Sequence, residues 1–277
     1  MKHISLSKSL PVVLVDTSYF IFYRYFSSVK WYQFRKKDID FTTIDQDDVF
    51  MKAFMKHILD DLKKICKTWK TQMSQMIFCC DCSRENIWRN EFTNQYKKNR
   101  IPNPCFNANI FFRFYQYLEA NQSDWKIHML YQDKLEADDI AYLTKTSLVE
   151  NGWDQPIIII TNDNDYLQLL DAQTKIYNMN GKGNDLAKRS CGDPKKDLRI
   201  KLIMGDKSDN IVAIHTGIGP KTAMKLACLT DEELDVYLTE KGCKEVYEKN
   251  RTLVDFKSIP QEYIDLYRNS FCWELMS

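Results

Sequence analysis

The residues with the clearest capacity for chemistry are nine carboxylates that stand at the ends of short apolar runs or at the starts of helical segments. They are Asp16, Asp81, Glu136, Asp138, Asp139, Asp163, Asp165, Asp206 and Asp209. Gathered in one crevice, so many acids would repel one another unless cations held them. Sites built from carboxylate oxygens select hard ions such as Mg²⁺ or Mn²⁺. The pattern therefore favours a two-metal site of the kind that cleaves phosphodiester bonds.

Four apolar runs must position these acids. They lie at residues 12–15, 76–80, 127–130 and 157–160, and none of them alternates with polar residues. Runs of this kind suit strands of a parallel sheet that is buried on both faces. Ligands of such sheets bind at the carboxyl ends of the strands, where the acids fall.

Helical patterns alternate with the runs, which predicts an α/β fold with a doubly wound, mostly parallel sheet. We expect a catalytic domain at 1–197 and a helical region at 198–277. Within them we predict helices near 19–28, 47–69 and 136–150, a helix after Asp163, an edge strand at 175–179, and a linker at 181–195. Residues 84–120 predict two helices with a tip at Asn103-Pro104, because proline breaks a helix there.

Helix capping is the simpler explanation of some of these acids, because helix starts favour aspartate. It could account for Asp16, Asp139 or Asp163 taken singly. It does not account for three acids in 136–139 together with the pairs in 163–165 and 206–209, since capping needs one acid per helix. We therefore interpret the whole set as functional.

A Gly-x-Gly turn follows the last acids, in the sequence Gly217-Ile218-Gly219-Pro220-Lys221-Thr222-Ala223. A turn of this kind at the start of a helix directs backbone N–H groups at a phosphate, and Lys221 and Lys225 are one turn apart. The alternative is an ordinary corner between helices with a glycine cap.

Positive charge and aromatic rings share one segment, in which Trp88 and Phe92 lie among Arg84, Arg89, Tyr96, Lys97, Lys98 and Arg100. Cations bind the phosphodiester backbone and rings stack on unpaired bases. The alternative is a solvated helix face, because Glu85 and Glu91 lie there too.

Bulk properties are those of a soluble globular protein, with 44% hydrophobic and 28% charged residues and a net charge of +1 that says nothing by itself about nucleic acid. No run approaches the roughly 18 apolar residues of a membrane span. No cleavable signal peptide is expected at the start. Nine cysteines, several of them in predicted strands, favour a reducing intracellular compartment, the cytoplasm or the nucleus. The segment Cys79-Cys80-Asp81-Cys82 lacks a partner Cys pair and is interpreted as packing rather than zinc binding.

Together these motifs resemble the 5′ nuclease superfamily, which includes flap endonucleases, the 5′-nuclease domain of DNA polymerase I and bacteriophage 5′-3′ exonucleases and RNase H enzymes. The resemblance runs from Val12 to about Cys228 and rests on 135–139, 161–165 and 205–211 as metal-binding signatures. Residues 217–223 resemble the helix-three-turn-helix hairpin, and 96–100 the start of the helical arch (about 84–115). Residues 212–216 depart from the family, whose stretch there contains Pro-Gly.

The resemblance implies a PIN-like fold and a role for each motif. Asp16, Asp81, Glu136 and Asp138 would hold a first metal; Asp163, Asp165, Asp206 and Asp209 would hold or influence a second, with Asp139 between them. Asp138, Asp163, Lys97 and Arg100 would be catalytic, the two cations acting on the scissile phosphate. DNA would contact Arg24, Arg84, Arg89, Tyr96, Lys97, Lys98, Arg100, Gly217, Gly219, Lys221, Thr222 and Lys225.

The resemblance also implies two Mg²⁺ ions, replaceable by Mn²⁺, and a K⁺ ion at the hairpin. The expected partners are branched, flapped or nicked DNA and RNA–DNA hybrid, in replication and repair, for a monomer that acts as a stand-alone nuclease. The residues at 271–277 do not resemble a clamp-binding tail, so clamp binding is not expected. Two alternatives stay open: a PIN-type ribonuclease, and a non-catalytic scaffold that binds branched DNA.

Overall fold

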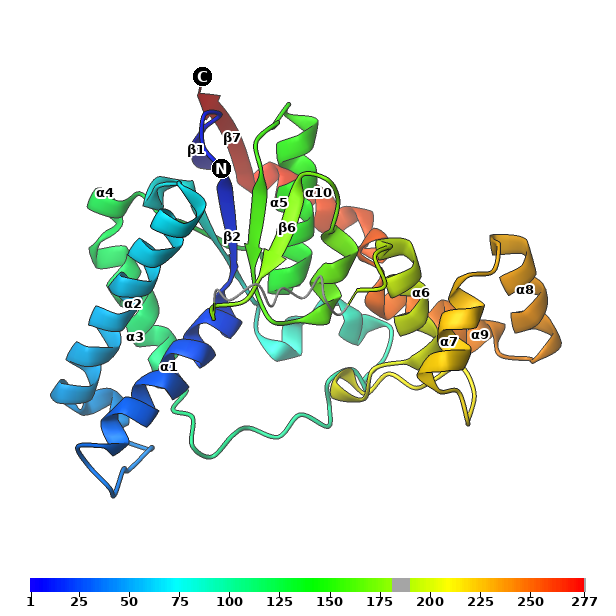
Figure 1. Cartoon of the computed structure of the whole chain (residues 1–277), viewed down its shortest axis with the longest axis horizontal. Helices are drawn as coiled ribbons and strands as arrows, with labels where there is room; N and C mark the ends of the chain where they lie inside the picture. Colours follow the sequence, from blue (N-terminus) through cyan, green and yellow to red (C-terminus); the bar gives the residue numbers. More distant parts are fainter. Residues whose placement is uncertain (181–189, 277) are drawn as a thin grey trace.

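The computed structural model describes residues 1–180 and 190–276, so most of the predicted linker at 181–195 lies outside the described residues. Its centre is a five-stranded parallel sheet with the strand order β4-β3-β2-β5-β6 (Figure 1). The strands are β2 (Val12–Asp16), β3 (Met76–Cys80), β4 (His128–Tyr131), β5 (Ile157–Ile160) and β6 (Thr174–Tyr177). The predicted parallel α/β fold is confirmed, as are the four apolar runs and the edge strand.

The order of the strands creates a crevice beside β2. The chain moves from β2 outward to β3 and β4 and then returns to β5 on the other side of β2. In register, Val15 of β2 lies between Phe78 of β3 and Ile160 of β5. Connections diverge from the carboxyl end of β2 at this switch in direction, which is where open α/β sheets bind ligands.

Helices cover both faces of this sheet (Figure 1). Val13 and Val15 pack on one face, and Val12 and Leu14 on the other, as the alternation of side chains along a strand requires. On the first face lie α1 (Thr17–Gln33), α2 (Asp48–Trp69) and α3 (Asn109–Ala120); on the second lie α5 (Ala137–Glu150) and α10 (Gln261–Ser270). The predicted apolar stripe of α2 is buried in full: Phe50, Phe54, Ile58, Leu62 and Ile65.

The helices after residue 193 form a third core, together with Cys82, Ile87 and Tyr96. These helices are α6 (Pro194–Met204), α7 (Pro220–Ala227), α8 (Asp231–Glu240) and α9 (Lys244–Val254). The chain then returns to the sheet, where Phe256, Tyr263 and Tyr267 join the core beneath α5. Packing therefore does not follow the expected division at 197 and 198, because 256–271 belong with the catalytic unit.

The two ends of the described chain meet in a small sheet that the sequence analysis did not foresee. Strand β1 (Lys2–Ser7) pairs in parallel with β7 (Phe271–Met276), with Ile4 opposite Trp273 (Figure 1). Ile4 and Leu6 are fully buried by this pairing and by the core of the second face.

The segment expected to begin a helical arch is not helical in its first half. It contains only the short 3₁₀ helices η3 (Arg84–Asn86) and η4 (Trp88–Glu91), and a long connection then runs to α3. In Figure 1 this connection crosses below the carboxyl ends of the strands, from the side of α1 to that of α7. Pro102 and Pro104 disfavour helix in the residues before them. The backbone forms local turns there, and the Lys97 N–H bonds to the distant Asp209 carbonyl. The predicted second half is present as α3.

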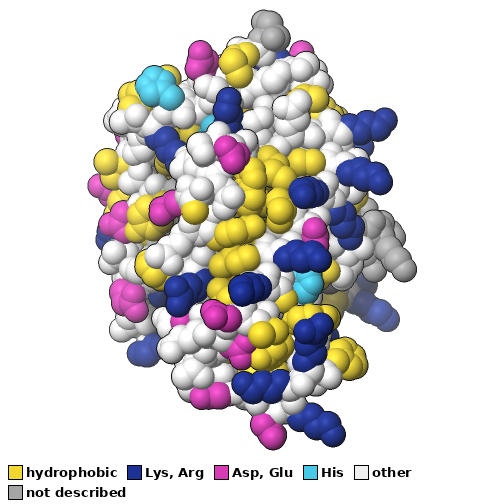
Figure 2. All heavy atoms as spheres, turned by 90° about the vertical axis from the view of Figure 1, so that its left-hand side faces the viewer, with side chains coloured by type: hydrophobic (Ala, Val, Ile, Leu, Met, Phe, Trp, Pro, Cys, Tyr) yellow, Lys and Arg dark blue, Asp and Glu magenta, His cyan; other side chains and the backbone are white. Residues whose placement is uncertain are grey.

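The remaining short elements are η1 (Ile44–Gln46), η2 (Met73–Gln75), α4 (Gln122–Trp125), η5 (Asn164–Leu169), η7 (Lys207–Asp209) and η8 (Phe256–Ser258). Figure 2 shows the face on the side of α1 to α4, where apolar side chains run between scattered Lys and Arg. Within 1–180 and 190–276, no helix combines the length and the apolar character needed to cross a membrane.

Candidate metal-dependent active site

Acids from several strand ends converge on a cavity of about 510 Å³ at the carboxyl edge of the sheet. The acids that line it are Asp16, Asp81, Glu136, Asp138, Asp163 and Asp206. Asp16 ends β2, Asp81 follows β3, and Asp163 follows β5. The crevice predicted from the sequence therefore exists, and six of the nine predicted acids lie on its wall.

Asp16 and Asp81 lie on neighbouring strands and are fixed by hydrogen bonds. Asp16 caps α1 by accepting from the Tyr19 backbone N–H (3.0 Å) and also accepts from the Thr161 hydroxyl (2.7 Å). Asp81 accepts from the Ala137 backbone N–H (2.9 Å) and from the Ser18 hydroxyl (2.5 Å). Burial, and then the nearby Asp81 carboxylate, raise the pKa of Asp16 to about 7.

The start of α5 brings three more acids together. One oxygen from each of Glu136, Asp138 and Asp139 lies within 4.8 Å of the others. Glu136 is the N-cap, and it forms a capping box with Asp139 at the third helical position. Capping, the simpler explanation of single acids, is thus real here, but it does not exhaust the group.

Asp138 and Asp139 have different surroundings. Asp138 lines the cavity, and burial, followed by the Asp139 carboxylate, raises its pKa well above the ordinary value. Asp139 is fully buried and accepts from both terminal nitrogens of Arg89 (2.8 Å each), from Trp88 Nε1 (2.9 Å) and from the Glu136 backbone N–H (3.1 Å). Asp139 was expected between the metals; its oxygens are instead committed to protein donors.

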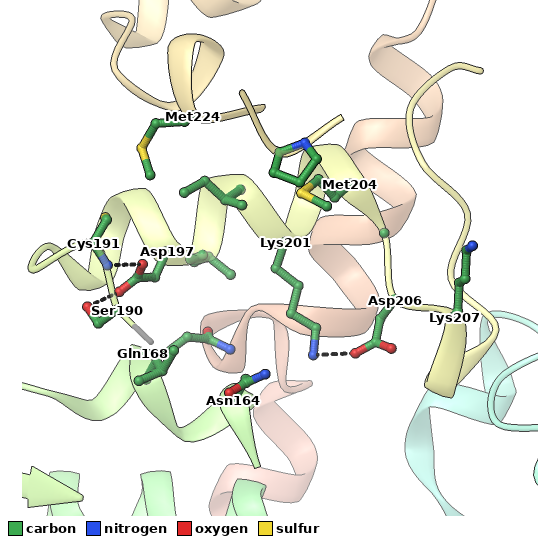
Figure 3. A pocket seen from close by; sticks show the side chains of 15 residues that line it. Asn164, Gln168, Ser190, Cys191, Asp197, Lys201, Met204, Asp206, Lys207 and Met224 are labelled. Carbon is green, nitrogen blue, oxygen red and sulfur yellow. Dashed lines mark hydrogen bonds and ion pairs between the residues drawn. The ribbon is translucent and has the colours of Figure 1, made fainter. Parts of the chain in front are cut away.

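The later acids are arranged around a lysine that the sequence analysis did not single out. Lys201 reaches from α6 to Asp206 (2.9 Å), as Figure 3 shows, and also pairs with Asp165. Burial opposes ionisation of Asp206, but Lys201 more than offsets it and lowers the pKa of Asp206 to about 2. A second cavity of about 640 Å³, lined in part by Lys201, Gln168 and Met224, adjoins the site at Asn164 and Asp206 (Figure 3).

The connection between η4 and α3 (residues 92–108) places two cations, Lys97 and Arg100, at the cavity. It is attached to the loop at 206–210, where Lys97 N–H donates to the Asp209 carbonyl (3.0 Å) and Asn99 to the Lys207 carbonyl (2.7 Å). Lys97 Nζ contacts Glu136 (2.5 Å), and Arg100 contacts Asp209 (2.5 Å). Both side chains line the cavity.

Opposite charges set the ionisation of Glu136. Burial works against its charged form, yet Lys97 and Arg89 outweigh burial and hold the pKa of Glu136 at about 2. The carboxylate is therefore ionised at neutral pH. Asp16 and Asp138, which face no such cation at hydrogen-bonding distance among the described residues, have raised pKa values instead.

This donor set fits divalent metal ions. Asp16, Asp81, Asp138 and Asp163 offer hard oxygens on one cavity wall. Burial, followed by a neighbouring carboxylate, raises the pKa of both Asp16 and Asp138, and a bound cation would offset both effects. Asp163 keeps its cavity position by capping η5 through the Asp165 N–H (3.0 Å). The predicted second group is less open, since Lys201 pairs with Asp165 and Arg100 pairs with Asp209.

The residues predicted to bind DNA differ in exposure, and two of them, Lys97 and Gly219, are partly covered. Lys98, Arg84, Arg100, Gly217, Lys221, Thr222 and Lys225 are exposed, and the last three lie on α7, which begins after Gly219. Arg24 is mostly covered and pairs with Asp61 of α2 (2.7 Å). Arg89 and Tyr96 differ from expectation: both are buried, and the Tyr96 hydroxyl donates to Glu136 (3.0 Å) rather than facing a base.

Val212, at the start of the segment 212–216, is held by a buried amide. Asn250 of α9 donates to the carbonyls of Leu202 and Val212, at 2.8 Å each.

Gly205 has φ +69°, and a Cβ there would lie 2.4 Å from the Ile211 carbonyl oxygen. This tight turn places Asp206 and Asp209. Only Gly205 could have been suspected from sequence; Asn250 and Lys201 give no local signal, and the signal at Arg89 predicted a contact with DNA instead.

Comparison with known proteins agrees with this geometry. A family profile described as the 5′-3′ exonuclease N-terminal resolvase-like domain matches residues 11–193. The chain is 27% identical over 250 residues to ribonuclease H of Enterobacteria phage T4, covering 82% of this chain and 80% of that protein. It is 26% identical over 226 residues to a 5′-3′ exonuclease of Buchnera aphidicola, covering 79% and 70%.

Solved structures show the same fold. The bacteriophage T5 5′-exonuclease with bound zinc superposes with a TM-score of 0.61 at 17% identity, covering 94% of this chain and 97% of that one. The T5 flap endonuclease in a pseudo-enzyme-product complex with DNA and metal ions gives a TM-score of 0.58 at 16% identity and the same coverage.

Proposed function

The chain belongs to the 5′-3′ exonuclease family defined by this N-terminal domain, and from that premise we propose that it is a divalent-metal-dependent, structure-specific 5′ nuclease. Its reaction is the hydrolysis of phosphodiester bonds in branched or 5′-ended DNA. The observation that carries the proposal is one cavity in which acids from β2, β3, α5 and η5 face Lys97 and Arg100 of the crossing connection.

The side chains divide the work by charge. Bound divalent ions would supply an activated water and stabilise the leaving 3′ oxygen. Asp16, Asp81, Asp138 and Asp163 would hold these ions, and Glu136 is ionised to join them. Lys97 and Arg100 would neutralise charge on the scissile phosphate, which requires them to exchange Glu136 and Asp209 for the substrate.

Contacts away from the cut would recognise shape rather than sequence. The exposed Lys221 and Lys225 of α7 suit the phosphates of a duplex, and the backbone at Gly217 and Gly219 is where a K⁺ ion is proposed. Lys98 and Arg84, on the crossing connection and just before it, suit the unpaired 5′ strand.

The finer assignments are also proposals. We assign Mg²⁺ as the physiological ion with Mn²⁺ as a substitute, because all candidate ligands are carboxylates. RNA–DNA hybrid joins flapped DNA as a substrate, and the protein acts as a monomer in replication and repair. A reducing intracellular compartment is supported by nine free cysteines, four of them buried.

The test is cleavage of a duplex that carries a labelled 5′ flap, in Mg²⁺ and in EDTA, by the purified full chain. We expect metal-dependent cutting at or near the junction. Changing Asp163 and Asp165 together to Asn should abolish it. The matched control is Asp171→Asn, because Asp171 follows the same η5 but pairs with Lys145 away from the cavity (2.6 Å).

Other outcomes would discard the proposal in distinct ways. Retained cutting in the Asp163/Asp165 double variant would remove the metal assignment. Cleavage of single-stranded RNA in preference to flapped DNA would favour a PIN-type ribonuclease. Tight DNA binding without cutting in either metal would favour a scaffold protein.

A further inference from the structure

Arg89, which was predicted to contact DNA, is a buried cation behind the acids of the site. It lies in η4 and is 1% exposed, with its guanidinium between the rings of Trp88 (4.6 Å) and Tyr96 (5.8 Å). Removing a charge from water is costly unless hydrogen bonds and opposite charges compensate it. The partners of Arg89 therefore indicate why it is there.

Those partners are two acids at the start of α5 and one backbone carbonyl. Arg89 donates through Nη1 to Glu136 (2.8 Å), through Nη1 and Nη2 to Asp139 (2.8 Å each), and through Nε to the Leu253 carbonyl (2.8 Å). Leu253 is in the last turn of α9, where helix carbonyls lack partners within the helix. One planar side chain thus joins η4, α5 and α9.

These bonds give the two oxygens of Glu136 different roles. Oε2 accepts from Arg89 and from the Tyr96 hydroxyl, whereas Oε1 meets Lys97, which lines the cavity. With one oxygen fixed from behind, the carboxylate cannot rotate freely about its last bond. Asp139 serves mainly to hold Arg89 in place, since every contact described for its side chain is to a protein donor.

We propose that Arg89 is a positioning residue for the active site: it orients Glu136 toward the cavity and ties that carboxylate to the end of α9. The inference rests on the proposed function and deepens it. It makes the C-terminal helices part of the metal-binding geometry and not only of a DNA grip. Supporting groups behind metal ligands commonly change metal affinity by ten- to a hundredfold when removed.

The experiment measures two things. The first is Mn²⁺ binding by the DNA-free protein, followed by the electron paramagnetic resonance signal of unbound Mn²⁺. The second is kcat and KM for cleavage of a 5′-flap duplex. Removing Arg89 alone would leave Asp139 buried and uncompensated, so the main variant is R89M/D139N, which removes both charges. We expect it to fold, to bind Mn²⁺ about ten- to a hundredfold more weakly, and to lose kcat with little change in KM. R89K keeps the charge without the planar fork and should be intermediate.

The matched control is R199M/D231N. Arg199 is also buried, and it pairs with Asp231 and donates to the Leu229 carbonyl (2.6 Å), but this pair lies among the C-terminal helices and its acid is exposed to solvent. This control should alter thermal stability while Mn²⁺ affinity stays at the wild-type value.

Wild-type Mn²⁺ affinity and kcat in R89M/D139N would overturn the inference; if that variant does not fold, wild-type values in R89K would do the same. Failure of the proposed function is separate, since in that case the wild-type protein itself would neither bind Mn²⁺ nor cut the flap.

Discussion

At the scale of single residues, Asp138 and Asp139 are neighbours in the chain with opposite environments. Asp138 faces the cavity, where burial and the Asp139 carboxylate disfavour its charge. Asp139 is compensated by Arg89 at 2.8 Å. An acid that we propose as a metal ligand is thus a source of instability in the metal-free protein, and the acid beside it is a source of stability.

We predict that Asp138→Asn abolishes flap cleavage but raises Tm in EDTA by a few degrees, since about 1 kcal/mol moves Tm by about 2–4 °C in a protein of this size. Asp139→Asn should instead lower the free energy of unfolding by about 3–5 kcal/mol, because it leaves Arg89 short of a buried counter-charge. Thermal unfolding of both variants in EDTA checks the pair. Equal changes in Tm of the same sign for the two variants would contradict the different roles of Asp138 and Asp139.

At the scale of elements, helix starts and turns do the positioning. The N-cap of α2 shows this without involving the site: Asp47 accepts from the backbone N–H groups of Val49 (3.1 Å) and Phe50 (3.0 Å) and from the Tyr32 hydroxyl (2.5 Å). The Tyr32 hydrogen bond, followed by the Phe50 N–H, lowers the pKa of Asp47. The ionised side chain joins α1 to α2.

A lowered folded-state pKa means that Asp47 contributes stability above its ordinary pKa near 4, and that this contribution is lost as pH falls through the folded value. We predict that Asp47→Ala costs about 1 kcal/mol at pH 7 and that this difference shrinks toward pH 3. Denaturant unfolding across pH 3–7 measures it. Asp48→Ala, one residue later and without the cap, should show a smaller cost; an equal cost would argue against the cap.

Gly205 is the second positioning element, because it turns α6 into the loop of Asp206 and Asp209. A Cβ at Gly205 meets the Ile211 carbonyl oxygen at 2.4 Å, whereas Gly242 has a similar φ (+64°) and open space. We predict that Gly205→Ala destabilises the protein by more than the about 1–2 kcal/mol of a left-handed L-residue and lowers cleavage of the folded fraction. Gly242→Ala should show only the backbone cost. If Gly205→Ala and Gly242→Ala had equal stability and cleavage, the contact between the new Cβ and the Ile211 carbonyl would be relieved without moving Asp206 or Asp209.

At the scale of the whole molecule, the two ends of the described chain close the catalytic unit. Strand β1 is joined to β7, and the chain from 256 to 271 packs on the same core as β2 and α5. Leu253 and Arg89 link this return path to the acids. The C-terminal helices are thus attached to the sheet in two ways: the Leu253 carbonyl of α9 bonds to Arg89, and residues 256–271 after α9 pack on the core of the sheet.

The β1–β7 sheet should therefore matter for stability and not for chemistry. We predict that Ile4→Ala, which removes a fully buried side chain, lowers the free energy of unfolding by about 2–5 kcal/mol. Cleavage per folded molecule should be unchanged. His3→Ala, on the exposed face of the same strand, is the control and should be near neutral. A loss of cleavage by folded Ile4→Ala would show that the small sheet also shapes the site.

Local sequence patterns were enough to predict the sheet, most of the helices that cover it and the position of most acids. Runs such as 157–160 and the stripe of α2 carry their burial in their own periodicity, and parallel strands bring their carboxyl ends to one edge whatever the details of packing. Asp16, Asp81 and Asp163 could be placed for this reason. The order along the chain of the three acidic segments, 135–139, 161–165 and 205–211, could also be read from the sequence.

Tertiary structure decided which polar groups face inward. Arg89 bonds to residues 47, 50 and 164 positions away, and Ser5 of β1 pairs with a residue 269 positions away. No local pattern encodes such partners, because the energy of a buried ion pair depends on where distant chain segments meet. A segment of cations and rings therefore predicted a DNA-facing helix, whereas the fold placed Arg89 and Tyr96 behind Glu136, where they hold the site in place.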